Sequence, residues 1–532
     1  MTTSYNTILG TETADSLVGT SGADSISALQ GNDTIDGKGG ADLLFGGQGQ
    51  DTLTTSAASN GATFKGDKDN DTISIGAISS NSTTFFGGLG NDSLVMGAAT
   101  LTSVYLSGDA GNDTISATTL TGATVYGGNS TGSYNDGNSD GGDNLAIASV
   151  LGSSFVNGNA ENDTITVTSS VTSSTLRGGS GNDSISAGIV VTSSVYGDLG
   201  ADSIVLGTAA QELRKVTVFG DNDTSSEGGN DTIILTAGTS LVSQTTITGG
   251  AGADTVNLIG GEVIGLDVNG NAGNDTITVN AQTSMISSTV YGGQGNDSFA
   301  VTSGSGGVFY GDKGADSFLG TFTSAKIYGD VAGAEGNDTF TTGTDSALSA
   351  TIYGGGGNDV FRESGNTGYV TSTLYGGAGA DSFTGGATGG AIFGEGGNDT
   401  IAFASFGNGK VLGGDGADTI GTSAATLSGT TLVGGAGGDV FAANTAASAS
   451  ASTFFFGFGS GADTLNAGSV SLGAVIAVSS TYGATGSYNA AGTVVTFGTG
   501  NTLTLNTNAS TSKAAGYITF ATVAQSAIDS LG

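Results

Sequence analysis

The sequence contains no cysteine, proline, histidine or tryptophan in 532 residues. Without cysteine there is no disulfide framework, and without histidine and cysteine the usual ligands of zinc, iron and copper are missing. The same absences exclude a zinc protease with paired histidines and any serine or cysteine nucleophile activated by histidine. Calcium, which is bound by oxygen atoms, is the metal that remains.

Basic residues are also scarce, with 11 Lys and Arg against 47 Asp and Glu, for a net charge of −36. This charge argues against nucleic acid and anionic membranes as partners and favours cations. No run of about 20 apolar residues could span a membrane. Residues Met1 to Asp15 lack the basic start and apolar core of an N-terminal signal peptide. We expect neither membrane insertion nor such a signal.

Glycine, in contrast, is abundant at 99 residues, and it recurs periodically. The stretch Thr289 to Val301 shows the unit, Thr-Val-Tyr-Gly-Gly-Gln-Gly-Asn-Asp-Ser-Phe-Ala-Val. Glycines form a turn that Asp297 closes, and the residues that follow alternate polar and apolar as in a half-buried strand. A single Gly-Asn-Asp is typical of an ordinary tight turn, because Asn and Asp tolerate left-handed backbone. Tandem copies instead predict a row of cation sites.

Motif acids run along nearly the whole chain. The first ones lie nine residues apart, at Asp15, Asp24, Asp33, Asp42 and Asp51. The later ones lie mostly 18 to 24 residues apart, at Asp71, Asp92, Asp113, Asp143, Asp163, Asp183, Asp202, Asp231, Asp254, Asp275, Asp297, Asp316, Asp338, Asp359, Asp381, Asp399, Asp418, Asp439 and Asp463. If two nonapeptides make one coil, calcium turns occupy both edges over residues 1–55 and one edge over residues 56–465.

The template Gly-Gly-x-Gly-x-Asp-x-(apolar)-x resembles the calcium-binding nonapeptide of the RTX β-roll family, as found in secreted bacterial surface-layer or fibril-type proteins. The resemblance implies an all-β, right-handed parallel β-roll or β-solenoid of about twenty coils. It implies about twenty Ca²⁺ ions, each held between the turns of successive coils by the motif acids and by carbonyls of turn glycines such as Gly292, Gly293 and Gly295. It also implies type I secretion to the cell exterior or surface.

The motif disappears near Asn466, so residues 466–532 form a third segment. Strands are expected at residues 474–478, 493–497, 502–505 and 517–520, which would make a β-rich cap over the end of the solenoid. By resemblance alone, the last residues would carry the secretion signal. Polar inserts at Gly128 to Asp140 and Asp221 to Gly228 are expected as surface loops.

Acids also stand where the second turn glycine is expected, at Asp67, Asp109, Asp198, Asp221, Asp312, Asp330, Glu395 and Asp415. They either add ligands or exploit the left-handed tolerance of Asp, which Glu395 fits poorly.

The residue just before the first turn glycine should point outward, because the residue before it is apolar. From the central repeat onward this outward position is apolar or aromatic, with an aromatic run at Tyr291, Tyr310, Tyr328, Tyr353, Tyr375 and Phe393. These side chains form either a stacking ladder between coils or an exposed contact strip. We predict that the strip packs against a neighbouring subunit or a glycan.

Repeats fill nearly everything from Asp15 to Asp463, and the few basic residues are scattered, so we expect no enzyme. The leading hypothesis is a secreted calcium-binding structural protein that folds on Ca²⁺ outside the cell and self-associates into a surface layer or filament. The alternative is a calcium-dependent adhesin or carbohydrate-binding solenoid that recognises a cell-surface glycan. Ice binding is less favoured, because regular Thr-x-Thr ladders are not found.

Overall fold

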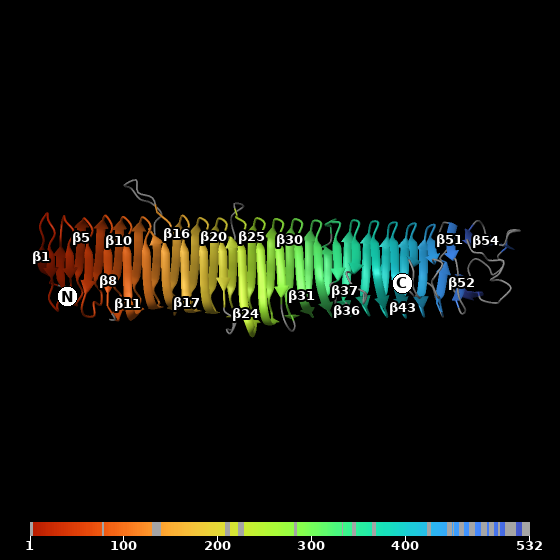
Figure 1. Ribbon diagram of the computed structural model, residues 1–532, viewed down its shortest axis with the longest axis horizontal. Helices are drawn as coiled ribbons and strands as arrows, with labels where there is room; N and C mark the ends of the chain where they lie inside the picture. Colours follow the sequence, from red (N-terminus) through yellow and green to blue (C-terminus); the bar gives the residue numbers. More distant parts are fainter. Residues whose placement is uncertain are drawn as a thin grey trace. The chain divides into compact units, whose positions relative to one another are not determined.

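The computed structural model describes residues 4–76, 79–129, 140–207, 213–221, 228–280, 285–331, 333–342, 347–363, 369–422, 427–443, 449–450, 452–456, 462–467, 474–479, 487–488, 494–497, 501–505 and 518–523. It divides into two compact units, residues 1–272 and 273–532. Each unit is a parallel β-solenoid whose coils contribute strands to two sheets (Figure 1).

The first unit has two sheets of stacked parallel strands. The first sheet contains β1 (Asn6–Leu9), β3 (Asp24–Ser27), β5 (Leu43–Gln48), β7 (Thr63–Lys68), β10 (Thr84–Leu89), β12 (Tyr105–Ala110), β14 (Thr124–Gly128), β16 (Phe155–Ala160), β18 (Thr175–Ser180), β20 (Ser194–Leu199), β23 (Thr217–Asp221), β25 (Thr246–Ala251) and β27 (Asp267–Ala272). The second contains β2 (Ser16–Val18), β4 (Thr34–Asp36), β6 (Thr52–Thr55), β8 (Thr72–Ile75), β9 (Ser80–Asn81), β11 (Ser93–Thr102), β13 (Thr114–Thr121), β15 (Asn144–Leu151), β17 (Thr164–Thr172), β19 (Ser184–Val191), β21 (Ser203–Leu206), β22 (Leu213–Arg214), β24 (Thr232–Ser243) and β26 (Thr255–Ile264).

The second unit repeats this arrangement. Its first sheet contains β30 (Thr289–Gln294), β32 (Val308–Lys313), β34 (Lys326–Asp330), β37 (Thr351–Gly356), β40 (Thr373–Ala378), β42 (Ala391–Gly396), β44 (Lys410–Asp415), β47 (Thr431–Ala436), β50 (Thr453–Phe456), β52 (Ala474–Ser479) and β56 (Ile518–Val523). Its second contains β28 (Thr276–Asn280), β29 (Met285–Ile286), β31 (Ser298–Ser305), β33 (Ser317–Thr323), β35 (Thr339–Thr342), β36 (Ala347–Leu348), β38 (Val360–Glu363), β39 (Tyr369–Val370), β41 (Ser382–Thr388), β43 (Thr400–Gly407), β45 (Thr419–Thr422), β46 (Leu427–Ser428), β48 (Val440–Ala443), β49 (Ala449–Ser450), β51 (Ala462–Ala467), β53 (Ser487–Tyr488), β54 (Val494–Phe497) and β55 (Asn501–Leu505).

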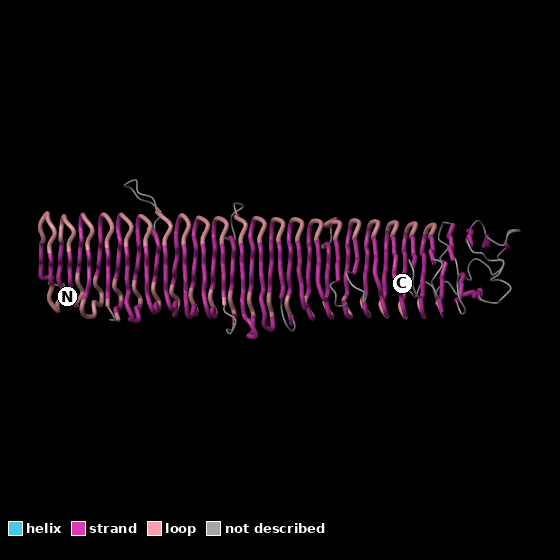
Figure 2. The backbone as a smooth tube through the Cα atoms, viewed as in Figure 1, coloured by secondary structure: helices cyan, strands magenta, loops and turns pink. Residues whose placement is uncertain are grey.

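The expected fold class is confirmed. The described residues form strands and turns with no helix, in about 19 turns of solenoid. In both units the turns lie at two edges, where they join the strands of successive coils (Figure 2). The predicted right-handedness stays a prediction.

The parallel register stacks like residues over one another, and this stacking builds a narrow core. The apolar residue two positions after the motif acid is fully buried at Ile26, Ile35, Leu44 and Leu53, as expected, whereas Leu17 is half-buried. In the second unit the same core position becomes a column of stacked rings, with Phe299 and Phe318 centroids 4.5 Å apart and Phe361 and Phe383 centroids 4.4 Å apart.

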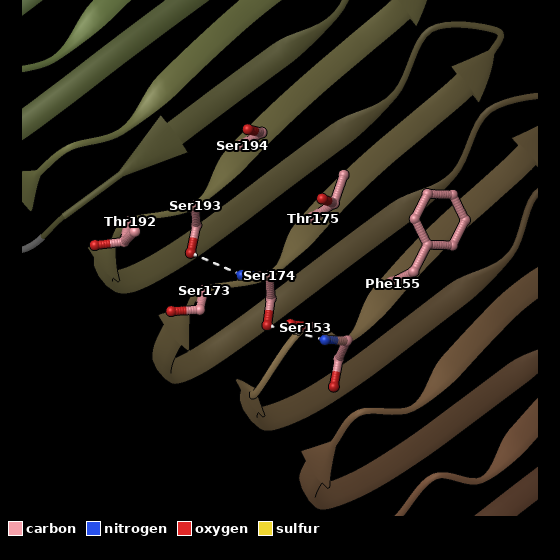
Figure 3. Close-up of a pocket in the computed structure, with 9 residues that line it drawn as sticks. Ser153, Phe155, Ser173, Ser174, Thr175, Thr192, Ser193 and Ser194 are labelled. Carbon is pink, nitrogen blue, oxygen red and sulfur yellow. Dashed lines mark hydrogen bonds between the residues drawn. The ribbon is translucent and has the colours of Figure 1, made fainter.

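The edge opposite the main row of motif acids is held by a ladder of buried hydroxyls. The Ser174 hydroxyl donates to the Thr172 carbonyl at 2.9 Å and accepts the backbone N–H of Ser154 at 3.2 Å. Ser193 does the same for the N–H of Ser174, and these bonds line an open hollow of about 420 Å³ formed by residues 153–155, 173–175 and 192–194 (Figure 3). A hydroxyl both donates and accepts, so this part of the edge closes without a charged group.

The tail contains strands where they were expected. β52, β54, β55 and β56 cover most of the anticipated ranges, and β54 pairs antiparallel with β55. Residues 524–532, where the secretion signal was expected, lie outside the described residues, as do residues 130–139 and 222–227 of the two polar inserts.

Candidate metal centre

The turn that ends in Asp297 shows how a motif acid is positioned. Gly293 has φ +113° and Gly295 has φ +130°, in the left-handed region that favours glycine. A Cβ on Gly295 would collide with the carbonyl oxygen of Gly273 in the preceding coil, so only glycine allows the coils to approach this closely. The two glycines bend the backbone so that the Asp297 side chain is buried inside the turn.

Motif acids on one edge are linked by a continuous ladder of hydrogen bonds. Asp297 Oδ1 accepts the backbone N–H of Asp275 at 2.7 Å, and the N–H of Asp297 donates to Asp316 Oδ1 at 2.7 Å. This link between one acid and the acid one coil later recurs through both units at 2.6 to 3.1 Å. One oxygen of each carboxylate therefore accepts a hydrogen bond from the preceding coil and holds the two coils together.

The second carboxylate oxygen is buried and has no hydrogen-bond donor. Asp297 is 2% exposed, and its Oδ2 makes no hydrogen bond. The same holds for Oδ2 of Asp33, Asp42, Asp51, Asp71, Asp92, Asp113, Asp143, Asp163, Asp183, Asp202, Asp231, Asp316, Asp338, Asp359, Asp381, Asp399, Asp418 and Asp439. A buried charged oxygen without a partner is costly, and its periodic recurrence indicates a ligand that the protein itself does not supply.

The space beside most of these oxygens is bordered by a backbone carbonyl of the next coil. A Cβ placed on Gly292 would meet Asp297 Oδ2 and would lie 2.8 Å from the carbonyl oxygen of Gly311 in the next coil. The first glycine of the turn thus keeps open a cradle bordered by a carboxylate oxygen and a carbonyl oxygen. Among the described residues, no three acidic, histidine or cysteine side chains gather closely enough to hold a metal on their own. A cation here needs carbonyl ligands from adjacent turns, and Ca²⁺ accepts such a mixture.

Burial and mutual repulsion disfavour the ionised form of these acids. Burial is the largest cause that raises the pKa of Asp71 to about 8, and repulsion by Asp92 and Asp51 adds to it. Burial with repulsion by Asp113 and Asp163 raises the pKa of Asp143 to about 9. Burial with repulsion by Asp316 raises the pKa of Asp297 to about 7. Without a cation, ionising every carboxylate along this edge would cost free energy, because the groups are buried and repel one another.

The predicted motif acids lie in two ladders. The first runs through Asp15, Asp33 and Asp51 and continues with the later acids of the first unit, while the second contains only Asp24 and Asp42, on the opposite edge. The acids from Asp275 onward form one ladder in the second unit. Their role as calcium ligands stays a prediction. The carbonyl oxygens of the first turn glycines could not be identified as candidate ligands from the side chains in the sequence. The stacking of coils brings each of them beside a motif acid of the preceding coil.

The acids at the second turn position divide into two groups. Asp67, Asp109, Asp198, Asp312 and Glu395 have φ between 72° and 82°, so they occupy the left-handed position of a glycine. Asp221 and Asp330 instead accept backbone N–H groups, Asp221 from Gly229 and Ala251, and Asp330 from Gly336 and Gly356. The placement of Asp415 was wrong, because the register sets Gly414 opposite Glu395 and puts Asp415 one position later.

The aromatic strip of the second unit is a column of parallel rings. Centroids of Tyr291, Tyr310, Tyr328, Tyr353, Tyr375 and Phe393 are 4.7 to 4.9 Å apart in sequence order, and adjacent ring planes differ by 4° to 8°. All six side chains are half-buried. The stacking ladder is therefore present. Because neighbouring rings cover the ring faces, a partner could contact only the ring edges and the hydroxyl groups of the strip.

The comparisons with known proteins agree with the repeat. A family model described as RTX calcium-binding nonapeptide repeat (4 copies) matches residues 9–44, 18–53, 104–118, 173–189, 246–258, 267–283, 351–362 and 372–401. No curated protein matches the chain. Within the described part of the chain, no helix is long and apolar enough to cross a membrane.

Proposed function

Because this chain carries RTX calcium-binding nonapeptide repeats, we propose that it is a secreted structural protein that folds on Ca²⁺ outside the cell and assembles with copies of itself into a surface layer or filament. The β-solenoid of such repeats is typically non-enzymatic, and we assign no catalytic role. The observation that carries the calcium part is the row of buried Oδ2 atoms without a donor, most of which lie beside a backbone carbonyl of the next coil.

The charge of the chain supports the same proposal. About twenty Ca²⁺ ions would add a charge of about +40 and nearly cancel the net charge of −36. An ion in each cradle would also replace repulsion between successive acids by attraction of both to the same cation. Cytosolic calcium is too scarce to fill these sites, so we infer that the chain is exported unfolded and folds where calcium is plentiful, since binding to the folded form alone stabilises it.

The aromatic strip favours self-association over glycan binding in the second unit. Sugars stack on aromatic side chains through the flat face of a ring, but the faces of Tyr310, Tyr328 and Tyr353 are already covered by their neighbours at 4.8 Å. What remains is a ridge of ring edges and hydroxyls, which suits packing against another protein surface. The adhesin alternative would need a glycan site elsewhere on the chain.

Electron microscopy of the full chain tests the assembly. In millimolar Ca²⁺ we expect filaments or lattices, and with the same chain in a chelator we expect neither. A matched pair of variants separates the strip from the fold: Y328S/Y353S should reduce assembly while leaving the circular dichroism spectrum in Ca²⁺ unchanged, and T351S/T373S, on the same sheet face, should assemble normally. Monodisperse particles of the calcium-loaded wild type at every concentration would refute self-assembly.

A further inference from the structure

The first two motif turns of the chain differ from those that follow them in how the acid is satisfied. Asp15 Oδ2 accepts the backbone N–H of Thr11 at 2.6 Å and the Thr11 hydroxyl at 2.9 Å. Asp24 Oδ2 accepts the N–H of Thr20 at 2.6 Å and the Thr20 hydroxyl at 3.0 Å. The same oxygen has no hydrogen-bond donor in the next acid of each ladder, Asp33 and Asp42. We call residues 10–15 and 19–24 the threonine turns.

The backbone of the threonine turns explains the difference. Neither turn contains a residue with left-handed φ, whereas the turn of Asp297 has two. Threonine is β-branched, and its side chain makes a left-handed conformation costly. The second residue of each threonine turn has no left-handed φ, and its N–H and hydroxyl donate to the carboxylate of the same turn, much as in a side-chain-capped turn.

Both carboxylate oxygens of Asp24 have donors within the protein. Oδ1 accepts the Asn6 side-chain amide at 2.8 Å, and Oδ2 accepts the Thr20 N–H at 2.6 Å and the Thr20 hydroxyl at 3.0 Å. The carboxylate is thus hydrogen-bonded at both oxygens without a metal. A cation would have to displace two hydrogen bonds to reach Oδ2, whereas at Asp42 it would displace none.

We propose that Thr11 and Thr20 decide which turns bind calcium, and that the two threonine turns hold no ion although their acids fit the repeat. This inference rests on the proposed calcium binding of the later turns. It departs from the expectation that Asp15 and Asp24 are ligands, and it makes Asp33 and Asp42 the first acids on their edges whose Oδ2 has no donor. In the first coil the acids of both turns are then hydrogen-bonded without calcium. The next coil can stack on this coil before any ion binds.

Native mass spectrometry of the full calcium-loaded chain can count bound ions one by one. We expect D15N and D24N to bind as many ions as the wild type, because asparagine still accepts the threonine N–H. The matched control D33N, one coil later on the same edge as Asp15, should bind at least one ion fewer. The double variant T11G/T20G, whose second turn residues can become left-handed, should bind up to two ions more.

The outcomes separate this inference from the function it rests on. Loss of an ion in folded D15N or D24N overturns the inference, and so does a T11G/T20G chain that folds, by circular dichroism, without gaining an ion. If T11G/T20G fails to fold, the asparagine variants still decide. A wild type with no bound calcium, or a D33N count equal to that of the wild type, would instead contradict calcium binding by the later turns.

Discussion

Protons should be able to replace calcium in holding these coils together. The ordinary pKa of an aspartate is 3.8, but in the folded chain burial and neighbouring acids raise it to about 6 at Asp183, about 7 at Asp297, about 8 at Asp338 and about 9 at Asp143. A group with a raised pKa binds its proton more tightly when folded than when unfolded. Between its folded-state pKa and the ordinary value of 3.8, each such acid binds more protons in the folded chain than in the unfolded chain, so the stability of the calcium-free fold should rise as the pH falls from about 9 towards about 4.

The size of the effect follows from the same values. For Asp297 the difference between 3.8 and about 7 corresponds to about 4 kcal/mol of folding free energy, at about 1.36 kcal/mol per pH unit. Because the turns lie at the surface, where water and counter-ions screen charge, we expect about half of this, or about 2 kcal/mol per ionised carboxylate. A few such terms equal the whole stability of a typical domain, about 5 to 15 kcal/mol.

The assay is circular dichroism on protein freed of calcium by chelation and desalting. At about pH 9 we expect little β signal, and on acidification to about pH 4, near the ordinary aspartate pKa, we expect it to appear. The calcium-loaded protein should keep its β signal across the same range, because the ions already compensate the carboxylates. In the variant D297N/D316N/D338N, which retains an acceptor for each backbone N–H, the signal should appear at a higher pH. Equal β signal in calcium-free protein at both ends of the range would refute the reasoning.

Four further changes test separate parts of the structure. Asp297→Ala removes a candidate ligand and the acceptor of the Asp275 N–H, so calcium crystals should show both the ion beside Asp297 and its neighbour disturbed; loss of a single ion would contradict the sharing of turns between ions. Ser174→Ala leaves the Ser154 N–H without its acceptor and should lower the free energy of unfolding by about 1–3 kcal/mol in urea titrations, whereas the exposed neighbour Ser173→Ala should change it little. Gly295→Ala combines a Cβ collision with Gly273 and a strained left-handed φ, and should lower the melting temperature of the loaded protein more than Gln294→Ala does. Calcium added to the apo protein near pH 7 in weak buffer should release protons from acids such as Asp297, and a pH electrode showing no release would speak against ionisation coupled to binding.

The sequence predicted the repeat and its edges because spacing alone carries that information. Acids nine residues apart had to alternate between two edges, and Asp15 with Asp33 and Asp24 with Asp42 indeed form separate ladders. The sequence also predicted that the apolar residue two positions before the first turn glycine points inward, and Val290 and Ile352 are buried as expected. Local periodicity fixes which side of a strand a residue faces.

Features that depend on contacts between coils could not be predicted in the same way. The bond from the Asp275 N–H to Asp297 Oδ1, and the cradle at Gly292 and Gly311, join residues about one coil apart in sequence, through atoms that no side-chain pattern marks. Thr11 did carry a signal, because a β-branched residue stands where the repeat expects glycine, but its meaning depended on where the threonine N–H points. The choice between contact strip and stacking ladder for Tyr353 depended on ring orientation, and the rings do stack.

We propose above that the buried carboxylate oxygens without donors bind calcium together with backbone carbonyls of the next coil. The most direct test is a crystal structure of the full chain grown with Ca²⁺, with the ions located by their anomalous scattering. We predict a peak about 2.3 to 2.6 Å from both Asp297 Oδ2 and the Gly311 carbonyl oxygen, repeated at each later turn of the ladder. An ordered turn with water or no density at that place would contradict the account.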